Sequence, residues 1–405
     1  MQKNSQMILE ANELKKEIQR KLAGIAEILC DSSDKFNNPG VLAGVSGLAL
    51  FMYYYARFTG ENKYAEFCEQ ALVKAVEMIN NGYTYHTFCS GISGLAWTCE
   101  HLEQNGFIDR DNISVFKDLD AYLLSCMEKD LEMKNYDYLH GGLGVGYYFL
   151  SKRSPNKKYI QSLYLGLQKA AIEGKDDAIK WESIMPESGK TIFNISLSHG
   201  MSSIVVVLTK LTKLYPNVVL IKTLLLNTIS YILQQQLSNP TVSYFPSFSL
   251  ESDEILHPSR LGWCYGDLGI AQALLQAAIA LGNKWHERAA IEILLHNCDR
   301  RDLNENRVIE AGLCHGASGI SHIFNRLYHN YQIDAFKEAS VYWMEKTLEM
   351  SYFSDGLAGY KSWRGDKDGW ENHYSLLEGI IGIGLSIISL MNPYLMNWDE
   401  CLLLS

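Results

Sequence analysis

The chain has 405 residues, of which 47% are hydrophobic and 20% charged, and its formal net charge is −10 at pH 7. This composition is typical of a globular protein with a large core, and the acidic balance excludes most nucleic-acid binders, because phosphate neutralisation requires a basic face. A cationic peptide is the favoured kind of partner.

The amino-terminal stretch MQKNSQMILEANELKKEIQRKL is amphipathic and charged, unlike a secretory signal. Nine dispersed cysteines predict free thiols in a reducing compartment. The most apolar stretches, 41–58 and 376–391, are shorter than the roughly 20 unbroken apolar residues of a spanning helix. We therefore expect a cytoplasmic protein that does not span a membrane.

Along the chain, stretches with apolar residues at three- and four-residue spacing, such as 64–79, 218–233 and 285–295, predict amphipathic helices. They alternate with runs that are more apolar. Each such run opens with a glycine, two further residues and a small residue, usually glycine, at Gly44, Gly91, Gly141, Gly200, Gly266, Gly316 and Gly379. In the fourth copy Ser203 replaces the second glycine.

This sevenfold recurrence predicts stacked copies of one unit, an outer amphipathic helix followed by an inner, more apolar one. The inner runs are apolar and glycine-rich, so we expect close packing on nearly all their sides. This favours a closed ring over an open solenoid. We predict one all-α domain over 1–405, an α/α toroid of seven inner and seven outer helices.

Two intervals, 175–197 and 236–263, lack helical periodicity. The second contains Pro240, Pro246 and Pro258 among alternating aromatic residues, which predicts loops or short β strands. Long loops inside a compact domain are often functional. We expect both intervals to form the rim of a substrate cleft.

The two positions before each first glycine collect metal-type side chains, notably Cys264 in the fifth copy and Cys314 and His315 in the sixth. In a closed ring these positions converge near the axis, and consecutive copies are neighbours. Two thiolates and one imidazole suit Zn²⁺, and three protein ligands leave its fourth position open, as in catalytic sites.

A lone cysteine is more often an ordinary buried residue. We interpret the cysteines outside the register in that way: Cys30, Cys68, Cys99, Cys126, Cys298 and Cys401. Cys89 shares the register of Cys264 and Cys314, but its copy lies far around the ring from theirs. We therefore expect Cys89 to be a core or cavity-wall thiol.

His199 directly precedes a helix-opening glycine in the copy next to the proposed metal ligands, which makes it the candidate proton donor or acceptor. Asp137, upstream in the third copy, would orient or charge-balance His199, or would cap a helix. Arg260 and Tyr265 flank Cys264 and would stabilise a developing oxyanion. His140 shares the ligand register, and its role stays open.

Several segments resemble those of the lanthionine synthetase C-like cyclases: RLGWCYGDLG at 260–269, GLCHGASG at 312–319 and SHG at 198–200, together with the sevenfold glycine pattern. The similarity extends over essentially the whole chain. It implies an α/α toroid that binds one zinc ion through Cys264, Cys314 and His315. It also implies acid–base roles for His199 and Asp137, supported by Arg260 and Tyr265.

The resemblance further implies the reaction: a cysteine thiol of a precursor peptide adds to dehydroalanine or dehydrobutyrine, which makes lanthionine or methyllanthionine rings. A chain of this length is similar to the stand-alone cyclases of lantibiotic maturation. Those imply three partners, namely a dehydrated precursor peptide, a separate dehydratase and an ABC-type exporter at the inner membrane face. The residues do not decide whether Asp137 or His199 deprotonates the thiol.

Two alternatives remain, the first with the same broad architecture and the second from a different class of protein. One is a zinc-dependent thiol alkyltransferase like the toroidal prenyltransferase β-subunits, which have a carboxylate among their metal ligands and six repeats. The other is a non-catalytic scaffold that binds glutathione or a peptide. Such a scaffold would not require the combination of Cys264, Cys314, His315 and His199.

Overall fold

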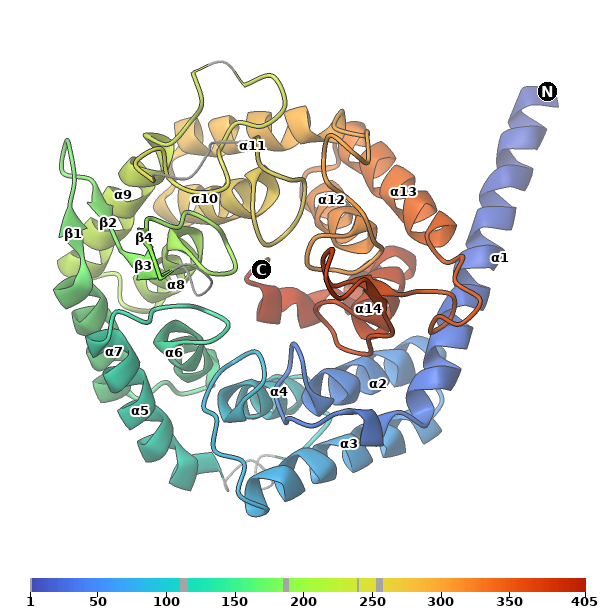
Figure 1. Ribbon diagram of the computed structural model, residues 1–405, viewed down its shortest axis with the longest axis horizontal. Coiled ribbons are helices and arrows are strands. Elements are labelled where there is room, and N and C mark those ends of the chain that lie inside the picture. The colour runs from blue at the N-terminus through green and yellow to red at the C-terminus, as the bar shows by residue number, and fades with distance from the viewer. Residues whose placement is uncertain (1, 110–115, 185–188, 239, 253–257) are drawn as a thin grey trace.

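The computed structural model describes residues 2–109, 116–184, 189–238, 240–252 and 258–405. Its α-helices form two concentric layers around a common axis (Figure 1). The inner layer consists of α2 (Val45–Thr59), α4 (Ile92–Gln104), α6 (Gly142–Ser151), α8 (Met201–Leu214), α10 (Asp267–Leu281), α12 (Ala317–Tyr331) and α14 (Ile380–Met391). The outer layer consists of α1 (Gln2–Cys30), α3 (Lys63–Asn80), α5 (Phe116–Glu132), α7 (Lys157–Ala170), α9 (Val219–Leu233), α11 (Lys284–Cys298) and α13 (Asp334–Glu349). The predicted all-α toroid of seven inner and seven outer helices is confirmed.

The inner helices begin at the glycine motifs because the preceding loop folds tightly over each helix start. A β-carbon on Gly91 would lie 2.4 Å from the carbonyl oxygen of Tyr85, and one on Gly94 would lie 2.1 Å from that of Phe88. The other motifs repeat this close approach to the carbonyl six residues earlier. In the fourth copy, the Ser203 hydroxyl donates to the Gly200 carbonyl oxygen at 2.6 Å.

Burial separates the two layers of helices. In α2 every residue from Val45 to Tyr55 is buried, whereas α7 buries Ile160, Leu163 and Leu167, which share one face. Inner helices are thus enclosed, and outer helices cover them with an apolar stripe. None of the described helices combines the length and the apolar character needed to cross a bilayer.

Short antiparallel strand pairs lie in the segments that connect the helices. Just before the first long interval lies β1 (Ile172–Glu173), which pairs with β2 (Ile179–Lys180) inside it, and the interval also contains β3 (Ser183–Ile184) paired with β4 (Thr191–Ile192). The second contains a bridge between Pro246 and Pro258. Residues 185–188, 239 and 253–257 of these two intervals lie outside the described residues. A hairpin that the sequence pattern did not predict, β5 (Ser362–Trp363) with β6 (Trp370–Glu371), precedes α14.

The carboxyl-terminal segment fills the middle of the ring (Figure 1). It comprises the 3-10 helices η3 (Pro393–Leu395) and η4 (Asn397–Leu402). Asp399 is fully buried and pairs with Arg326 and His322 of α12. The backbone carbonyls of Cys401 and Leu402 accept hydrogen bonds from Tyr138 Oη at 2.9 Å and Trp263 Nε1 at 2.7 Å. The interior is therefore a packed core at this level.

Candidate functional site

Two registers of residues surround the axis at the end of the ring where the inner helices begin. The position directly before each first glycine is at least partly exposed in all seven repeats: Ala43, Ser90, His140, His199, Tyr265, His315 and Glu378. The position before that is buried in all seven: Leu42, Cys89, Leu139, Ser198, Cys264, Cys314 and Leu377. We call the first set the exposed register and the second set the buried register.

Backbone hydrogen bonds join the buried register into an almost closed circle. They run from Leu42 N to Cys89 O (3.1 Å), Cys89 N to Leu139 O (2.9 Å), Ser198 N to Cys264 O (3.4 Å), Cys264 N to Cys314 O (3.2 Å), Cys314 N to Leu377 O (2.8 Å) and Leu377 N to Leu42 O (3.0 Å). Each bond joins neighbouring repeats, and the last joins the seventh repeat to the first. The backbone itself thus holds the cysteine-bearing positions together.

The junction between the third and fourth repeats differs from the others. Among the described residues, no backbone hydrogen bond joins Leu139 to Ser198. The Leu139 N–H instead donates to Oδ1 of Asp137 at 2.7 Å, and Oδ2 of Asp137 lies 2.6 Å from Nδ1 of His199. The Asp137 carboxylate therefore replaces a backbone link with a side-chain link.

Cys264, Cys314 and His315 form a cluster that can hold a metal ion. One ligand atom from each lies within 4.8 Å of the others. The fifth and sixth repeats are adjacent, and the bond from Cys264 N to Cys314 O brings the two thiols into register. Two sulfurs and one imidazole nitrogen fit a borderline-soft divalent ion with one coordination position left for another ligand.

Hydrogen bonding and charge polarise this cluster. The hydrogen bond from the Cys314 thiol lowers the pKa of Cys264 well below its ordinary value, and His315 and Arg260 add to the shift. The same hydrogen bond, together with burial, raises the pKa of Cys314. Burial opposes protonation of His315, but its hydrogen bond and attraction to Cys264 outweigh burial and raise its pKa. The pair of sulfurs therefore shares one negative charge readily.

His199 and Asp137 form the second part of the site. Burial favours the neutral imidazole of His199, but the hydrogen bond and charge of Asp137 outweigh it, so that the pKa of His199 is raised. Burial likewise opposes ionisation of Asp137, and His199 outweighs it and lowers the pKa of Asp137. Asp137 also accepts the His140 N–H at 2.8 Å. The arrangement engages Nδ1 of His199 with Asp137 and favours the protonated form of the imidazole.

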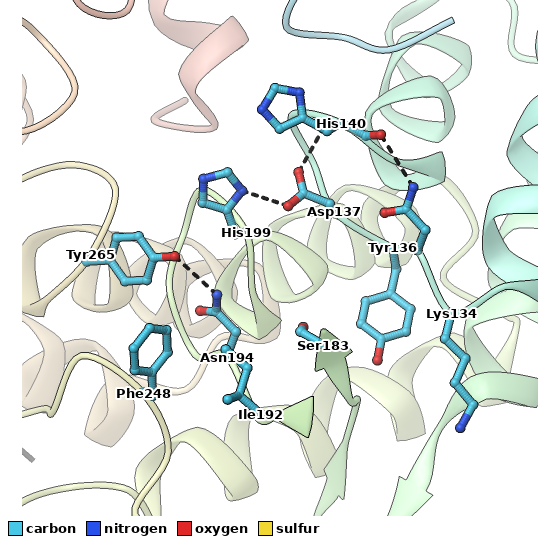
Figure 2. Close-up of a pocket in the computed structure, with 11 residues that line it drawn as sticks. Lys134, Tyr136, Asp137, His140, Ser183, Ile192, Asn194, His199, Phe248 and Tyr265 are labelled. Carbon is cyan, nitrogen blue, oxygen red and sulfur yellow. Dashed lines mark hydrogen bonds and ion pairs between the residues drawn. The ribbon is translucent and has the colours of Figure 1, made fainter. Parts of the chain in front are cut away.

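Tyr265 and Arg260 flank the cluster as the sequence placed them. The ring centroid of Tyr265 lies 6.0 Å from that of His199 and 5.7 Å from that of Phe248. Burial raises the pKa of Tyr265 to about 12, so the phenol keeps its proton near neutral pH. Its hydroxyl accepts a hydrogen bond from Asn194 Nδ2 at 3.4 Å, a partner that the sequence pattern did not single out (Figure 2).

A cavity of about 310 Å³ lies at the junction between the third and fourth repeats (Figure 2). Its lining residues are Lys134, Asn135, Tyr136, Asp137, His140, Ser183, Ile192, Asn194, His199, Phe248 and Tyr265. Ser183 and Ile192 come from the first long interval and Phe248 from the second, so both intervals contribute to the cavity. Tyr265 follows Cys264 in the chain, which places the cavity beside the metal cluster.

The two residues whose roles the sequence left open differ in exposure. His140 is exposed and lines the cavity, with its ring stacked on that of His199 at a centroid distance of 6.0 Å. Cys89 is buried, and burial raises its pKa to about 12. His140 is therefore within reach of a substrate in the cavity, whereas Cys89 has the environment of an inert core thiol.

Fold and site together define an α/α toroid with a candidate metal centre where its inner helices begin. The family model described as "Lanthionine synthetase C-like protein" matches residues 35–403. The chain therefore belongs to the lanthionine synthetase C-like proteins.

Solved structures add a comparison of folds. One titled "Nisin cyclase" is similar over 97% of this chain and 98% of that chain, with a TM-score of 0.72 and 19% sequence identity. Another, titled "Crystal structure of sugar epimerase from ruminal bacterium", overlaps 94% of this chain and 98% of that chain, with a TM-score of 0.45 and 11% identity. The first likeness supports the toroid, and the second is too weak to bear on the assignment.

Proposed function

We propose that this chain is a zinc-dependent peptide cyclase that forms lanthionine and methyllanthionine rings. The observation that carries the proposal is the proximity of the Cys264, Cys314 and His315 cluster to the His199–Asp137 pair, shown by the effect of Cys264 on the pKa of His199. Three ligands leave one position for a substrate, and an acid–base pair lies beside it. Membership of the lanthionine synthetase C-like family and the nisin cyclase fold support it.

The donor set suits zinc, because two thiolates and an imidazole are typical zinc ligands. Bound there, the ion would hold the cysteine of the substrate as a thiolate at its open position, since a coordinated thiol loses its proton. The sulfur then forms a bond to the β-carbon of the dehydro residue. The electrons of the carbon–carbon double bond move toward the neighbouring carbonyl. The α-carbon receives one proton in place of the one that the thiol releases to water, so the mass of the peptide is unchanged.

His199 is the proposed donor of that proton. Asp137 engages Nδ1 and raises the pKa of His199, which favours the protonated imidazole and makes Nε2 the nitrogen available to the substrate. This geometry supports a role for Asp137 in setting the orientation and charge of His199. Thiol deprotonation by Asp137 would use a carboxylate whose Oδ1 already accepts the backbone N–H groups of Leu139 and His140 and whose Oδ2 pairs with His199.

Tyr265 and Arg260 are proposed to stabilise the negative charge that develops on the carbonyl oxygen. The Tyr265 phenol keeps its proton because burial raises its pKa, so it can donate to an oxyanion. Arg260 carries a fixed positive charge close enough to lower the pKa of Cys264, after the hydrogen bond from Cys314 and the contribution of His315.

The proposed substrate is a dehydrated precursor peptide, bound in the cavity between the third and fourth repeats. The net charge of −10 favours a cationic peptide. A separate dehydratase would supply the dehydro residues, and an exporter at the inner membrane face would receive the product. We propose a cytoplasmic location for this assembly and one domain for the chain.

The decisive experiment incubates purified protein with a dehydrated precursor peptide. We expect free thiols to disappear without a change in peptide mass, and we expect a chelator to stop the reaction and added zinc to restore it. A parallel sample contains a prenyl donor and an ordinary cysteine peptide instead of the dehydrated peptide. Transfer of the prenyl group, or binding of peptide without loss of thiols, would replace the cyclase assignment with one of the two other classes.

A further inference from the structure

Glu310 is a buried carboxylate next to the metal cluster that the sequence pattern did not single out. It is 2% exposed and lies six residues before Gly316. Its backbone carbonyl accepts the Ala317 N–H at 3.0 Å, which fixes the residue at the start of α12. Burying a carboxylate is costly unless its oxygens find donors, so the partners of its two oxygens indicate its purpose.

The two carboxylate oxygens have different surroundings. Oε2 accepts the backbone N–H of Trp363 in β5 at 2.6 Å. Oε1 has no hydrogen-bond partner within the described residues and lies 3.3 Å from Nε2 of His315. One oxygen is thus held by the β5–β6 hairpin, and the other is left for the imidazole.

Gly312 makes room for this arrangement. A β-carbon at this position would lie 2.8 Å from Oε1 of Glu310 and 2.9 Å from the carbonyl oxygen of Glu378. A larger residue would therefore push the carboxylate away from His315. The order Glu310, Gly312, Cys314, His315 places the carboxylate, its clearance and two of the proposed ligands within one loop.

We propose that Glu310 is a positioning residue that accepts a hydrogen bond from Nε2–H of His315 and so turns the Nδ1 lone pair toward the metal. A carboxylate on the second nitrogen of a ligand histidine fixes its tautomer and ring orientation and increases its basicity. The link through Trp363 joins the β5–β6 hairpin to the same ligand. This role rests on the proposed zinc centre, because it concerns how that centre is held.

Glu310→Gln tests the hydrogen bond at nearly constant volume, because it puts an NH2 donor in place of one of the two oxygens that face Trp363 and His315. Glu310→Asp keeps the charge but shortens the reach by one carbon–carbon bond. Glu378→Gln is the matched control: Glu378 lies in the exposed register of the next repeat and pairs with Arg364. This substitution therefore removes a nearby charge but keeps the carboxylate that accepts from His315.

Zinc dissociation constants are measured by chelator competition on full-length protein, with circular dichroism to verify folding. We expect both Glu310 variants to bind zinc about 10- to 100-fold more weakly, and Glu378→Gln to bind like the wild type. With ¹⁵N-labelled histidine, the zinc-loaded wild type should show His315 protonated at Nε2, with a signal that Glu310→Gln shifts. Glu310→Asp carries the affinity test if Glu310→Gln does not fold.

Two results overturn this role while leaving the zinc centre in place: unchanged zinc affinity in both Glu310 variants, or an equal loss of affinity in Glu378→Gln. The second result would mean that local negative charge, not the hydrogen bond, governs affinity. A wild-type protein that binds no zinc would instead overturn the proposed function, and the role of Glu310 with it.

Discussion

The carboxylate of Asp137 and the imidazole of His199 meet at 2.6 Å across the one junction of the described ring where the buried register lacks an inter-repeat backbone bond. Asp137 satisfies the Leu139 N–H that the circle would otherwise have used. The cavity lies at this junction, and Asp137 and His199 are among its lining residues. One side chain therefore both completes the ring and sets the charge of the proposed proton donor.

Asp137→Ala should destabilise the fold, because the buried Leu139 N–H loses its acceptor. An unsatisfied buried donor costs about 1–3 kcal/mol, and we expect a loss of that size in the free energy of unfolding from urea titration. Asp137→Asn keeps an oxygen at this position and should lose less. Wild-type stability in Asp137→Ala would contradict the structural part of this role.

The charge of Asp137 should also appear in the pH dependence. The pKa of His199 is raised from 6.5 because Asp137 outweighs burial. The stabilisation by this pair is thus complete between pH 3.8 and 6.5, the ordinary pKa values of Asp137 and His199. It is lost as the pH rises through the raised pKa of His199, and cyclisation should decline over the same range as His199 loses its proton. In Asp137→Asn the alkaline decline should move to lower pH.

Profiles of kcat/KM against pH measure this shift. Asp130→Asn serves as the control, because Asp130 pairs with a different histidine, His86, at 2.7 Å. His140 also faces His199, and although His140 is exposed to the cavity, desolvation by the surrounding protein lowers its pKa, which favours its neutral form near pH 7. Identical alkaline limbs in Asp137→Asn and the wild type would dissociate Asp137 from the charge of His199.

His199→Ala should keep its fold and its zinc and lose most ring formation. General acid–base groups contribute typically about 10² to 10⁴ in rate, and His199 is not part of the Cys264, Cys314 and His315 cluster. Metal analysis and the cyclisation rate of a dehydrated peptide, measured on the same preparation, test both halves. Undiminished cyclisation would remove His199 from the mechanism.

One tightly bound zinc per chain should depend on the two proposed cysteine ligands. Cys264→Ala and Cys314→Ala each remove a sulfur from the cluster, and elemental analysis should show substoichiometric zinc in both. Cys89→Ala is the internal control, since Cys89 occupies the same buried register but lies outside the cluster. Near-stoichiometric zinc in either ligand variant would show that the ligand set is wrong.

The toroid could be predicted from the sequence because its cause recurs in the sequence. A β-carbon at the first glycine of each motif would meet a carbonyl six residues earlier, so the same packing demands the same residue seven times. The adjacency of Cys264 and Cys314 follows from ring order alone. The roles assigned to these residues, and the single-domain organisation, stay predictions.

Other features leave no periodic signal. The gap beside Leu139 depends on where one backbone bond is missing, and the position of Glu310 depends on a rotamer and on a hairpin from another repeat. The carboxyl-terminal segment fills the ring through single contacts such as Asp399 with Arg326. A tertiary contact that occurs once in the fold produces no repeated sequence pattern, so it could not be predicted from the repeats.

The final prediction concerns the substrate. Thiolate addition requires a β-carbon that is conjugated with a carbonyl, which dehydroalanine and dehydrobutyrine provide and an intact serine or threonine does not. The proposed roles of His199, Tyr265 and Arg260 all require that the thiolate adds to such a double bond, because they protonate or stabilise the product of that addition. We therefore expect this chain to form rings in a dehydrated precursor and none in the same peptide before dehydration, as measured by thiol alkylation and mass spectrometry. The His199→Ala protein, incubated with the dehydrated peptide, controls for spontaneous addition. Rings made from the undehydrated peptide by this chain alone would contradict the need for a separate dehydratase.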